Sequence, residues 1–416
     1  MKFKLTSLEK KWVLYDVGNS AFTMMVSTIF PIYFNALAEG AGISDVDYLA
    51  YWGYATSVCT LIVAILGPTL GAIADTKNFK KIIFSISMGI GVFGCILLGF
   101  LSSWIWFLGV FVLAKTGYSA SLIFYDAMLT DVTEPERMDS VSSHGYAWGY
   151  IGSCIPFIAC LGIVLGAGSL GIGTQTSMIL AFVITALWWL CSSIPLLRSY
   201  RQKYFSDADG HVVRNSFKRL GRTFIELTKE KHIFIFLLAF FFYIDGVYTV
   251  IDMATAYGQA LGLDSTGLLL ALLVTQIVAF PCVLIFSRLV KKIKPEAIIT
   301  ICIAAYFCIA VYAYWLDTQF DFWLLAVLVG MFQGTIQALS RSYFAKIIPA
   351  EKSGEFFGIY DICGKGASVI GTALVSVLSQ MTGSINIGVS ALSVMFLIGL
   401  VLFRYSAKLN AGRQTQ

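Results

Sequence analysis

Charged residues are scarce in this chain of 416 residues, where only 13% are Asp, Glu, Lys or Arg and 58% are hydrophobic. Soluble domains carry roughly a quarter charged residues, and so few charges could not cover the surface of a water-soluble globule. A disordered chain needs the opposite balance and is excluded by the same composition. The sequence therefore indicates an integral membrane protein.

Patterns that carry enzymatic or cofactor chemistry are also missing. The nine cysteines fall in apolar stretches without metal-ligand spacing, so we expect reduced thiols, no metal site and no disulfide framework. No Gly-x-x-x-x-Gly-Lys-Ser/Thr loop, Gly-x-Ser-x-Gly or His-Glu-x-x-His occurs, which argues against an ATP-driven pump and against an enzyme. We expect no cofactor. None of the three histidines lies at mid-membrane, so any proton coupling would depend on carboxylates.

Long apolar runs are what the chain has in abundance. A helix needs ~20 mostly apolar residues to cross the hydrocarbon core. Twelve runs meet this length, at 12–38, 48–74, 82–101, 104–129, 145–166, 176–197, 232–258, 266–290, 296–316, 320–347, 355–380 and 384–404. They lack the alternation of a barrel strand, so we predict an all-α multi-pass membrane protein.

Basic residues predict the orientation of these helices. With the N-terminus inside, every Lys and Arg lies on the cytoplasmic side except Lys115 and Lys365, which fall within spans. The charged side chains of the outer loops are all acidic, such as Glu39 and Asp45. This asymmetry predicts that both termini are cytoplasmic. We expect a bacterial plasma membrane.

One long polar segment divides the chain. Residues 198–231 carry nine basic residues between the sixth and seventh helices. We predict a six-helix bundle at 1–197, a cytoplasmic linker at 198–231 and a second six-helix bundle at 232–416. The linker cations favour contact with anionic lipid headgroups. A nucleic-acid partner is not expected, because the linker has no recognisable module.

Short similarities between the halves favour an internal repeat. Residues 15–18 (YDVG) in the first helix resemble residues 243–246 (YIDG) in the seventh. Phe124-Tyr125 and Tyr343-Phe344 lie near the ends of the fourth and tenth helices. Two six-helix bundles in parallel repeat are typical of transporters that bind substrate near the midplane, between the halves.

Charges inside the spans are the first candidates for the transport site, because each costs at least ~2.5–3.5 kcal/mol at the bilayer centre. Lys115 and Asp245 lie near the middle of helices four and seven, and we predict that both face one water-filled cavity between the halves, where they could pair. Two further sets are the helix-eleven pair Asp361–Lys365, which could be purely structural, and Asp252, two turns beyond Asp245.

Other polar groups in the spans are weaker candidates. Asp16 and Asp126 lie nearer the cytoplasmic ends, where solvation or hydrogen bonding between helices would account for them. The remaining candidates for this site are Asn19, Gln333, Gln337 and Tyr243. Gln333 and Gln337 are spaced to form a polar stripe along helix ten, which we expect to face water, although interhelical hydrogen bonds are the alternative.

The segment 71–81 (GAIADTKNFKK) resembles the loop motif between helices two and three of the major facilitator superfamily, although its basic pair comes one residue late. This resemblance implies the major facilitator fold and a cytoplasmic gate at Asp75, Lys80 and Lys81. Its expected partner is the start of helix eleven, at Gly354 and Glu355. We add Arg341, at the end of the polar stripe, to this gate.

Further segments in both halves are similar to the vacuole-effluxer-like subgroup, relatives of the autophagy-linked vacuolar amino-acid effluxer. They are 12–22 (WVLYDVGNSAF), 124–129 (FYDAML), 141–152 (VSSHGYAWGYIG), 245–255 (DGVYTVIDMAT), 333–342 (QGTIQALSRS) and 355–365 (EFFGIYDICGK). The resemblance covers nearly the whole chain and offers an amino acid as the analogy for the cargo, while the direction of transport stays open.

These observations predict a monomeric secondary transporter that works by alternating access on a small zwitterionic or anionic solute, such as an amino acid or short peptide. Lys115 and Lys365 would meet its carboxylate, and Asp245 would meet its amine or carry a coupling proton. Two alternatives stay open. One is a transporter of a lipid-like molecule, which the many aromatic residues allow. The other is a non-transporting receptor or scaffold.

Overall fold

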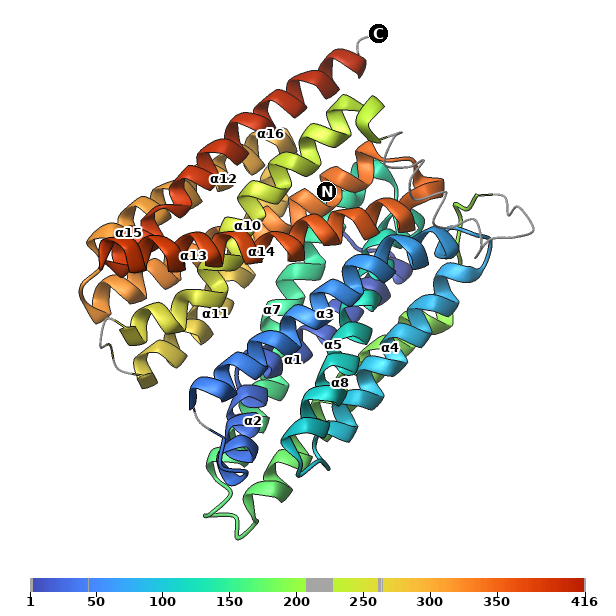
Figure 1. Ribbon diagram of the computed structural model, residues 1–416. Coiled ribbons are helices and arrows are strands. Elements are labelled where there is room, and N and C mark those ends of the chain that lie inside the picture. The colour runs from blue at the N-terminus through green and yellow to red at the C-terminus, as the bar shows by residue number, and fades with distance from the viewer. Residues whose placement is uncertain (1–2, 44, 207–226, 261–262, 264, 415–416) are drawn as a thin grey trace. The chain divides into compact units, whose positions relative to one another are not determined.

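The computed structural model describes residues 3–43, 45–206, 227–260, 263 and 265–414, and nearly all of them are helical (Figure 1). In the first half the helices are α1 (Ser7–Ser27), α2 (Ile29–Gly40), α3 (Asp45–Ala74), α4 (Phe79–Leu98), α5 (Trp104–Ala127), α6 (Leu129–Val132), α7 (Pro135–Leu165) and α8 (Thr174–Ser199). In the second half they are α10 (Lys231–Ala260), α11 (Ser265–Leu289), α12 (Pro295–Tyr312), α13 (Gln319–Ile347), α14 (Ser353–Thr382), α15 (Ile385–Ser390) and α16 (Leu392–Gln414), with short 3₁₀ turns at Ala313–Trp315 and Ala350–Lys352.

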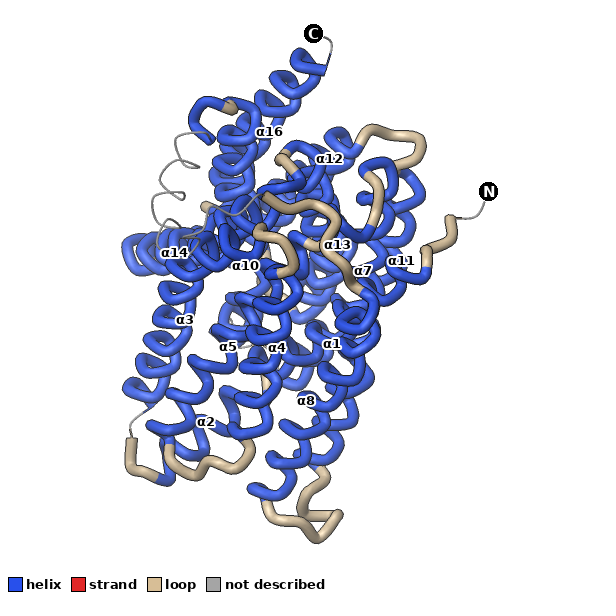
Figure 2. The backbone as a smooth tube through the Cα atoms, turned by 90° about the vertical axis from the view of Figure 1, so that its right-hand side faces the viewer, coloured by secondary structure: helices blue, strands red, loops and turns tan. Residues whose placement is uncertain are grey.

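The predicted all-helical membrane fold is confirmed. Within the described ranges, eleven helical segments are long and apolar enough to cross a membrane. The run predicted at 355–380 corresponds to α14, whose apolar part is Ile370–Thr382. Only helices and loops appear along the described chain (Figure 2), apart from one isolated parallel β-bridge between Thr76 and Ser206.

Two predicted spans differ from the observed helices for identifiable reasons. The run at 12–38 is broken at Thr28 into α1 and α2. Pro31 explains the break, because a proline removes a backbone donor and its ring collides with the carbonyl four residues earlier. Helix α7 begins at Pro135, ten residues before the predicted start, since proline is well suited to the first helical position. Its polar first turns carry no hydropathy signal.

The described chain forms two compact units. The first unit comprises residues 1–132, 148–212 and 351–358, and the second comprises residues 133–147, 213–350 and 359–416. Helices α7 and α14 therefore each contribute residues to both units.

Helix pairing inside the two units follows one pattern. In the first unit α1 packs on α8, α3 on α5, and α4 on both α5 and α8. In the second unit α10 packs on α16, α11 on α13, and α12 on both α13 and α16. Corresponding helices thus have corresponding neighbours, which agrees with the predicted repeat.

A matching hydrogen bond marks the repeat at the level of single residues. The Tyr15 hydroxyl on α1 lies 2.7 Å from the Ser121 hydroxyl on α5. The Tyr243 hydroxyl on α10 lies 2.7 Å from the Ser340 hydroxyl on α13. The similarity of residues 15–18 to residues 243–246 therefore reflects an equivalent position in each unit.

Close contacts at two glycines hold α7 against α1. A Cβ atom at Gly152 would lie 2.5 Å from Val17 Cγ1, and one at Gly149 would lie 2.8 Å from Ser20 Oγ. Both distances are shorter than side chains tolerate, so these two positions accept only glycine without rearrangement.

Candidate functional site

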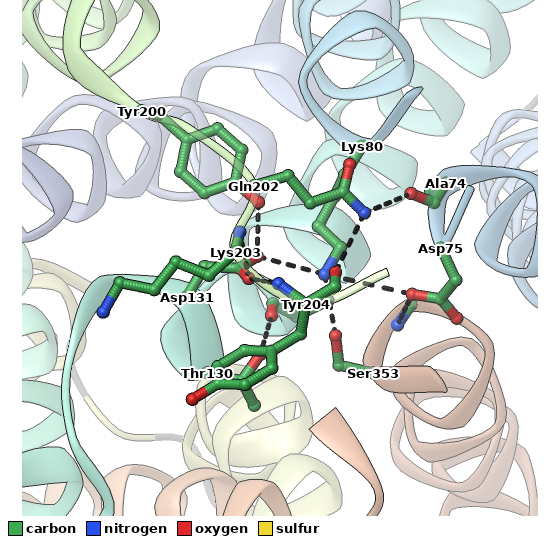
Figure 3. Close-up of polar contacts among 12 residues, drawn as sticks. Ala74, Asp75, Lys80, Thr130, Asp131, Tyr200, Gln202, Lys203, Tyr204 and Ser353 are labelled. Carbon is green, nitrogen blue, oxygen red and sulfur yellow. Dashed lines mark hydrogen bonds and ion pairs between the residues drawn. The ribbon is translucent and has the colours of Figure 1, made fainter. Parts of the chain in front are cut away.

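A buried polar cluster lies in the first unit where α3 turns into α4 (Figure 3). We call it the Asp75 cluster and define it as Asp75, Lys80, Asp131 and Ser353 together with residues 200–206. The four side chains come from the α3–α4 turn, from the start of α4, from α6 and from the start of α14. Asp75, Lys80, Asp131 and Ser353 are all fully buried.

Asp75 binds the beginning of α14. Its Oδ1 accepts a hydrogen bond from the Gly354 amide at 2.7 Å, and its Oδ2 accepts one from the Glu355 amide at 2.9 Å. The first amides of a helix have no partner inside the helix, and the positive end of the helix dipole favours a carboxylate there. Asp75 therefore caps α14 from another helix, on the two residues that the loop motif predicted as its partners.

The tight approach of α14 to α3 depends on three glycines, which carry no side chain. A Cβ at Gly71 would overlap the Gly354 carbonyl oxygen, and a Cβ at Gly354 would lie 2.9 Å from Asp75 Oδ1. One turn further along α14, a Cβ at Gly358 would lie 2.7 Å from Pro68 Cα. The glycines let two backbones come close enough for the carboxylate to reach the amides.

Lys80 connects the acidic residues of the cluster. Its ammonium nitrogen lies 3.1 Å from Asp131 Oδ2 and 3.9 Å from Asp75 Oδ1, and it donates to Ser353 Oγ at 2.8 Å. A buried ammonium needs such partners, because an unpaired charge in the protein interior is strongly unfavourable. Lys81, the other half of the predicted basic pair, is half-exposed.

Asp131 was not among the residues predicted from the sequence. Its Oδ1 accepts from the backbone amides of Lys203 and Tyr204 at 3.0 and 2.9 Å, and its Oδ2 accepts from the Tyr200 hydroxyl at 2.5 Å. Burial and the Asp131 carboxylate raise the pKa of Tyr200 well above its usual value, so the phenol is the donor. The only sequence signal was an acid shortly after the predicted fourth span.

The residues 200–206, which we call the strap, run along this cluster (Figure 3). The Ser206 amide donates to the Asp75 carbonyl at 2.8 Å, and Gln202 Nε2 donates to the Ala74 carbonyl at 3.2 Å. Lys77 Nζ lies 5.3 Å from the centre of the Phe205 ring. The sequence had assigned this segment to a lipid-facing linker, whereas its first residues bind protein. Residues 207–226 of the predicted linker lie outside the described part of the chain.

Arg341 belongs to a second polar cluster, in the second unit. Its guanidinium donates from Nε to Ser142 Oγ at 2.9 Å and from Nη2 to the Ser142 carbonyl at 3.1 Å, and it lies 4.4 Å from the Tyr146 ring centre. Nearby, Lys346 pairs with Asp139 at 2.5 Å. The sequence predicted Arg341 as a gate residue but missed its partners on α7.

Among the candidates for the transport site, Asp245 and Lys115 lie in different units. Asp245, in α10, is fully buried rather than open to water, and its recorded partners are the Gly371 amide and the Thr249 hydroxyl. Lys115, in α5, is half-buried, with its ammonium 5.6 Å from the centre of the Phe111 ring. Their predicted pairing stays a prediction.

The other polar candidates lie mostly in packed surroundings. Asn19 donates from Nδ2 to the Tyr15 carbonyl at 3.1 Å and to Asp16 Oδ1 at 3.4 Å, and both Asn19 and Asp16 are buried. Gln333 and Gln337 are buried as well, so their stripe does not face water in this conformation. Asp126 and Asp361 are half-buried. The side chains of Asp252 and Lys365 lie outside the described part of the structure.

Comparisons with known proteins agree with this architecture. The family model described as "Vacuole effluxer Atg22 like" matches residues 7–136 and 130–416. An uncharacterized MFS-type transporter of Bacillus subtilis, YxiO, is 42% identical over 410 residues, covering 97% of this chain and 96% of the relative. Autophagy-related protein 22 of Coccidioides immitis is 23% identical over 435 residues, covering 85% of this chain and 72% of the relative.

Solved structures show the same fold at low identity. The human organic anion transporter MFSD10 superposes with a TM-score of 0.71 at 12% identity, covering 95% of this chain and 99% of that one. The transporter FucP in its outward conformation superposes with a TM-score of 0.72 at 13% identity, covering 96% and 97%. The chain is a multi-pass membrane transporter of the major facilitator type and not an enzyme, and it belongs to the vacuole-effluxer Atg22-like family.

Proposed function

We propose that this transporter moves a small zwitterionic or anionic solute, of the size of an amino acid or a short peptide, by alternating access. The observation that carries the proposal is the binding of the α14 amides by Asp75. Alternating access needs a closure that is specific and yet weak enough to break in every cycle. Helix capping by a carboxylate is worth about 0.5–2 kcal/mol, which thermal motion and cargo binding can overcome.

Lys115 is the residue that we assign to the cargo carboxylate. A lysine in the middle of a membrane helix is costly and is usually retained for a functional contact. Its ammonium lies 5.6 Å from the centre of the Phe111 ring, and an aromatic face stabilises a cation. The cargo carboxylate would bind at this ammonium. The family likeness to a vacuole effluxer supports the cargo class and favours export.

The test begins with purified protein. A thermal-shift screen of metabolites should give stabilisation by amino acids or short peptides, and flux of the hits into proteoliposomes should follow. Lys115→Met should abolish the shift by anionic and zwitterionic hits, because the carboxylate loses its cation. Lys10→Met is the control, since Lys10 is an exposed lysine in the same unit. Equal shifts in both variants would overturn the assignment.

A lipid-like cargo is the second candidate, and one observation favours it. A small pocket of about 20 Å³, whose accessible surface is entirely apolar, lies inside the second unit. It is lined by side chains that include Val250, Met253, Phe322, Leu325 and Leu392. Stabilisation by lysolipids and not by amino acids in the same screen would select this candidate.

A further inference from the structure

Asp245 presents an unusual combination of burial and incomplete bonding. It lies in the middle of α10 and is fully buried. Oδ1 accepts hydrogen bonds from the Gly371 amide at 3.1 Å and from the Thr249 hydroxyl at 3.2 Å. Oδ2 is buried and has no hydrogen-bond partner among the described atoms. Oδ1 of the carboxyl group therefore accepts two hydrogen bonds, and Oδ2 accepts none from the described atoms.

A bare, buried carboxylate oxygen is strongly unfavourable, because a charge in a low-dielectric interior needs a partner. A metal cation would need several oxygen ligands, whereas Gly371 presents an N–H group to this carboxyl. A proton needs only the free oxygen. We propose that Asp245 is the proton-binding site of the transport cycle, with the proton on Oδ2 and with Gly371 and Thr249 holding Oδ1. The inference rests on the proposed function, because it names the coupling ion of that transporter.

The site is built into the contact between α10 and α14. An amide inside a helix ordinarily donates to the carbonyl four residues earlier. The Gly371 amide donates to a side chain on another helix, the Asp245 carboxyl. Gly371 has no side chain, and a Cβ there would lie 2.7 Å from Asp245 Oδ1 and overlap the Thr249 hydroxyl. Loss of the proton would leave a carboxylate that needs water, so α14 would have to move away from α10. This requirement links proton release to helix movement.

No described side chain takes the place of the proton, because Asp245 makes no ion pair with any of them. On the side of α16, α10 meets Phe396 and Gly399 through Gly246 and Tyr243. The described titratable and charged groups on the packed helices are Lys231, His232, Tyr243, Tyr248 and Tyr257 on α10, Arg288 and Cys282 on α11, Asp321, Arg341, Tyr343 and Lys346 on α13, Glu355, Tyr360, Asp361 and Cys363 on α14, and Arg404, Tyr405, Lys408 and Arg413 on α16.

Infrared difference spectroscopy can detect the proton without any cargo. Purified protein in lipid is titrated from acid to alkaline pH, and the carbonyl band of a protonated, buried carboxylic acid is followed. We expect a titrating band in the natural protein and its complete loss in Asp245→Asn. Thr249→Val should shift the band, because it removes one hydrogen bond to the carboxyl. An unchanged spectrum in Asp245→Asn overturns the proposal.

Two glycine variants provide a matched pair within α14. Gly371→Ala should move the band and its titration midpoint, because the added methyl group displaces the carboxyl. Gly364→Ala should leave both unchanged, since its Cβ would meet its nearest neighbour at 3.5 Å, an ordinary contact. If Gly371→Ala fails to fold, Thr249→Val still tests the same carboxyl. Equal midpoints in Gly371→Ala, Thr249→Val and the natural protein contradict the proposed geometry.

Flux measurements separate this inference from the proposed cargo. With a hit from the metabolite screen, a pH gradient should accelerate flux by the natural protein and have no effect on Asp245→Asn. A gradient effect of equal size in both overturns the coupling role. If no amino acid or peptide is transported, the cargo class fails, while the infrared band still decides whether Asp245 binds a proton.

Discussion

Gly71 and Gly354 touch through their backbones, and a methyl group on Gly71 would lie 2.7 Å from the Gly354 carbonyl carbon. The obstructing atoms belong to the main chain, so no side-chain rotation can relieve the overlap. Because Asp75 reaches the amides of α14 only at this separation, the close approach is a precondition for the cap.

We therefore predict that Gly71→Ala weakens the docking of α14 on α3 by about 1–3 kcal/mol, the usual cost of an overpacked contact. Hydrogen exchange of the peptide that begins α14 should become faster. Gly53→Ala in the same helix is the control, because nothing lies within 4 Å of its Cβ. Equal exchange in the two variants would show that the glycine contact does not hold α14.

Removal of the cap itself should have a more local effect. Asp75→Ala takes away the acceptor for the Gly354 and Glu355 amides, and a lost cap of ~1.4 kcal/mol makes exchange about tenfold faster. Asp321→Ala is the matched control, since Asp321 accepts from the Thr318 amide at the start of α13. It should accelerate exchange at α13 and leave α14 unchanged. The reverse pattern, or no change, would contradict the assignment of Asp75.

Stability should depend on pH through the same carboxyl. Burial raises the pKa of Asp75 to about 7, although the positive charge of Lys80 opposes the shift. The folded chain then binds a proton between about pH 4 and pH 7 that the unfolded chain has released. This extra proton stabilises the folded chain. The gain in free energy of unfolding is complete at pH values below the pKa of the unfolded chain and is lost as the pH rises through about 7.

Thermal unfolding of the natural protein and of Asp75→Asn, measured at a series of pH values, checks this sign. The midpoint of the natural protein should fall relative to that of the variant between about pH 4 and pH 7 and then level off. A difference that is constant with pH, or that rises, would be inconsistent with a raised pKa.

Asp131 should matter more for stability than any single partner that it binds. Asp131→Asn leaves Lys80 buried beside Asp75, 3.9 Å away, as its only remaining carboxylate, so we expect a loss of roughly 3–5 kcal/mol. Tyr200→Phe removes one hydrogen bond to a charged group and should cost about 1.5–3 kcal/mol. The thermal unfolding midpoints of the two variants, compared with that of the natural protein, measure both losses of stability.

Tyr204→Phe supplies the control for the strap. Tyr204 binds Asp131 through its backbone amide, which phenylalanine keeps, so the change should stay within about 0.5 kcal/mol. If Tyr200→Phe also changes the free energy of unfolding by no more than about 0.5 kcal/mol, the strap is held by its backbone hydrogen bonds alone.

The sequence was most informative where one physical requirement dominates. Bilayer thickness fixes the length of an apolar run, so the spans were located closely. The break at Thr28 needed a finer rule, the effect of Pro31 on the preceding turn. The partners of Asp75 came from the resemblance of its loop to a known motif.

Long-range partners were out of reach of sequence reasoning. Asp131 obtains its role from the strap, about 70 residues away along the chain, and no local pattern encodes that contact. Gln333 and Gln337 show a second limit of sequence reasoning, which concerns burial. Their spacing on α13 is real, but a polar stripe can be buried as readily as wetted, and here both residues are buried.

The burial of the Lys80–Asp131 pair has a consequence for osmotic and ionic stress. Both side chains are fully inaccessible to solvent, and mobile counterions screen buried pairs far less than exposed ones. The Arg413–Glu230 pair, with both partners about half exposed, is open to such screening. A rise in salt concentration should therefore weaken the Arg413–Glu230 pair and leave the Lys80–Asp131 pair intact.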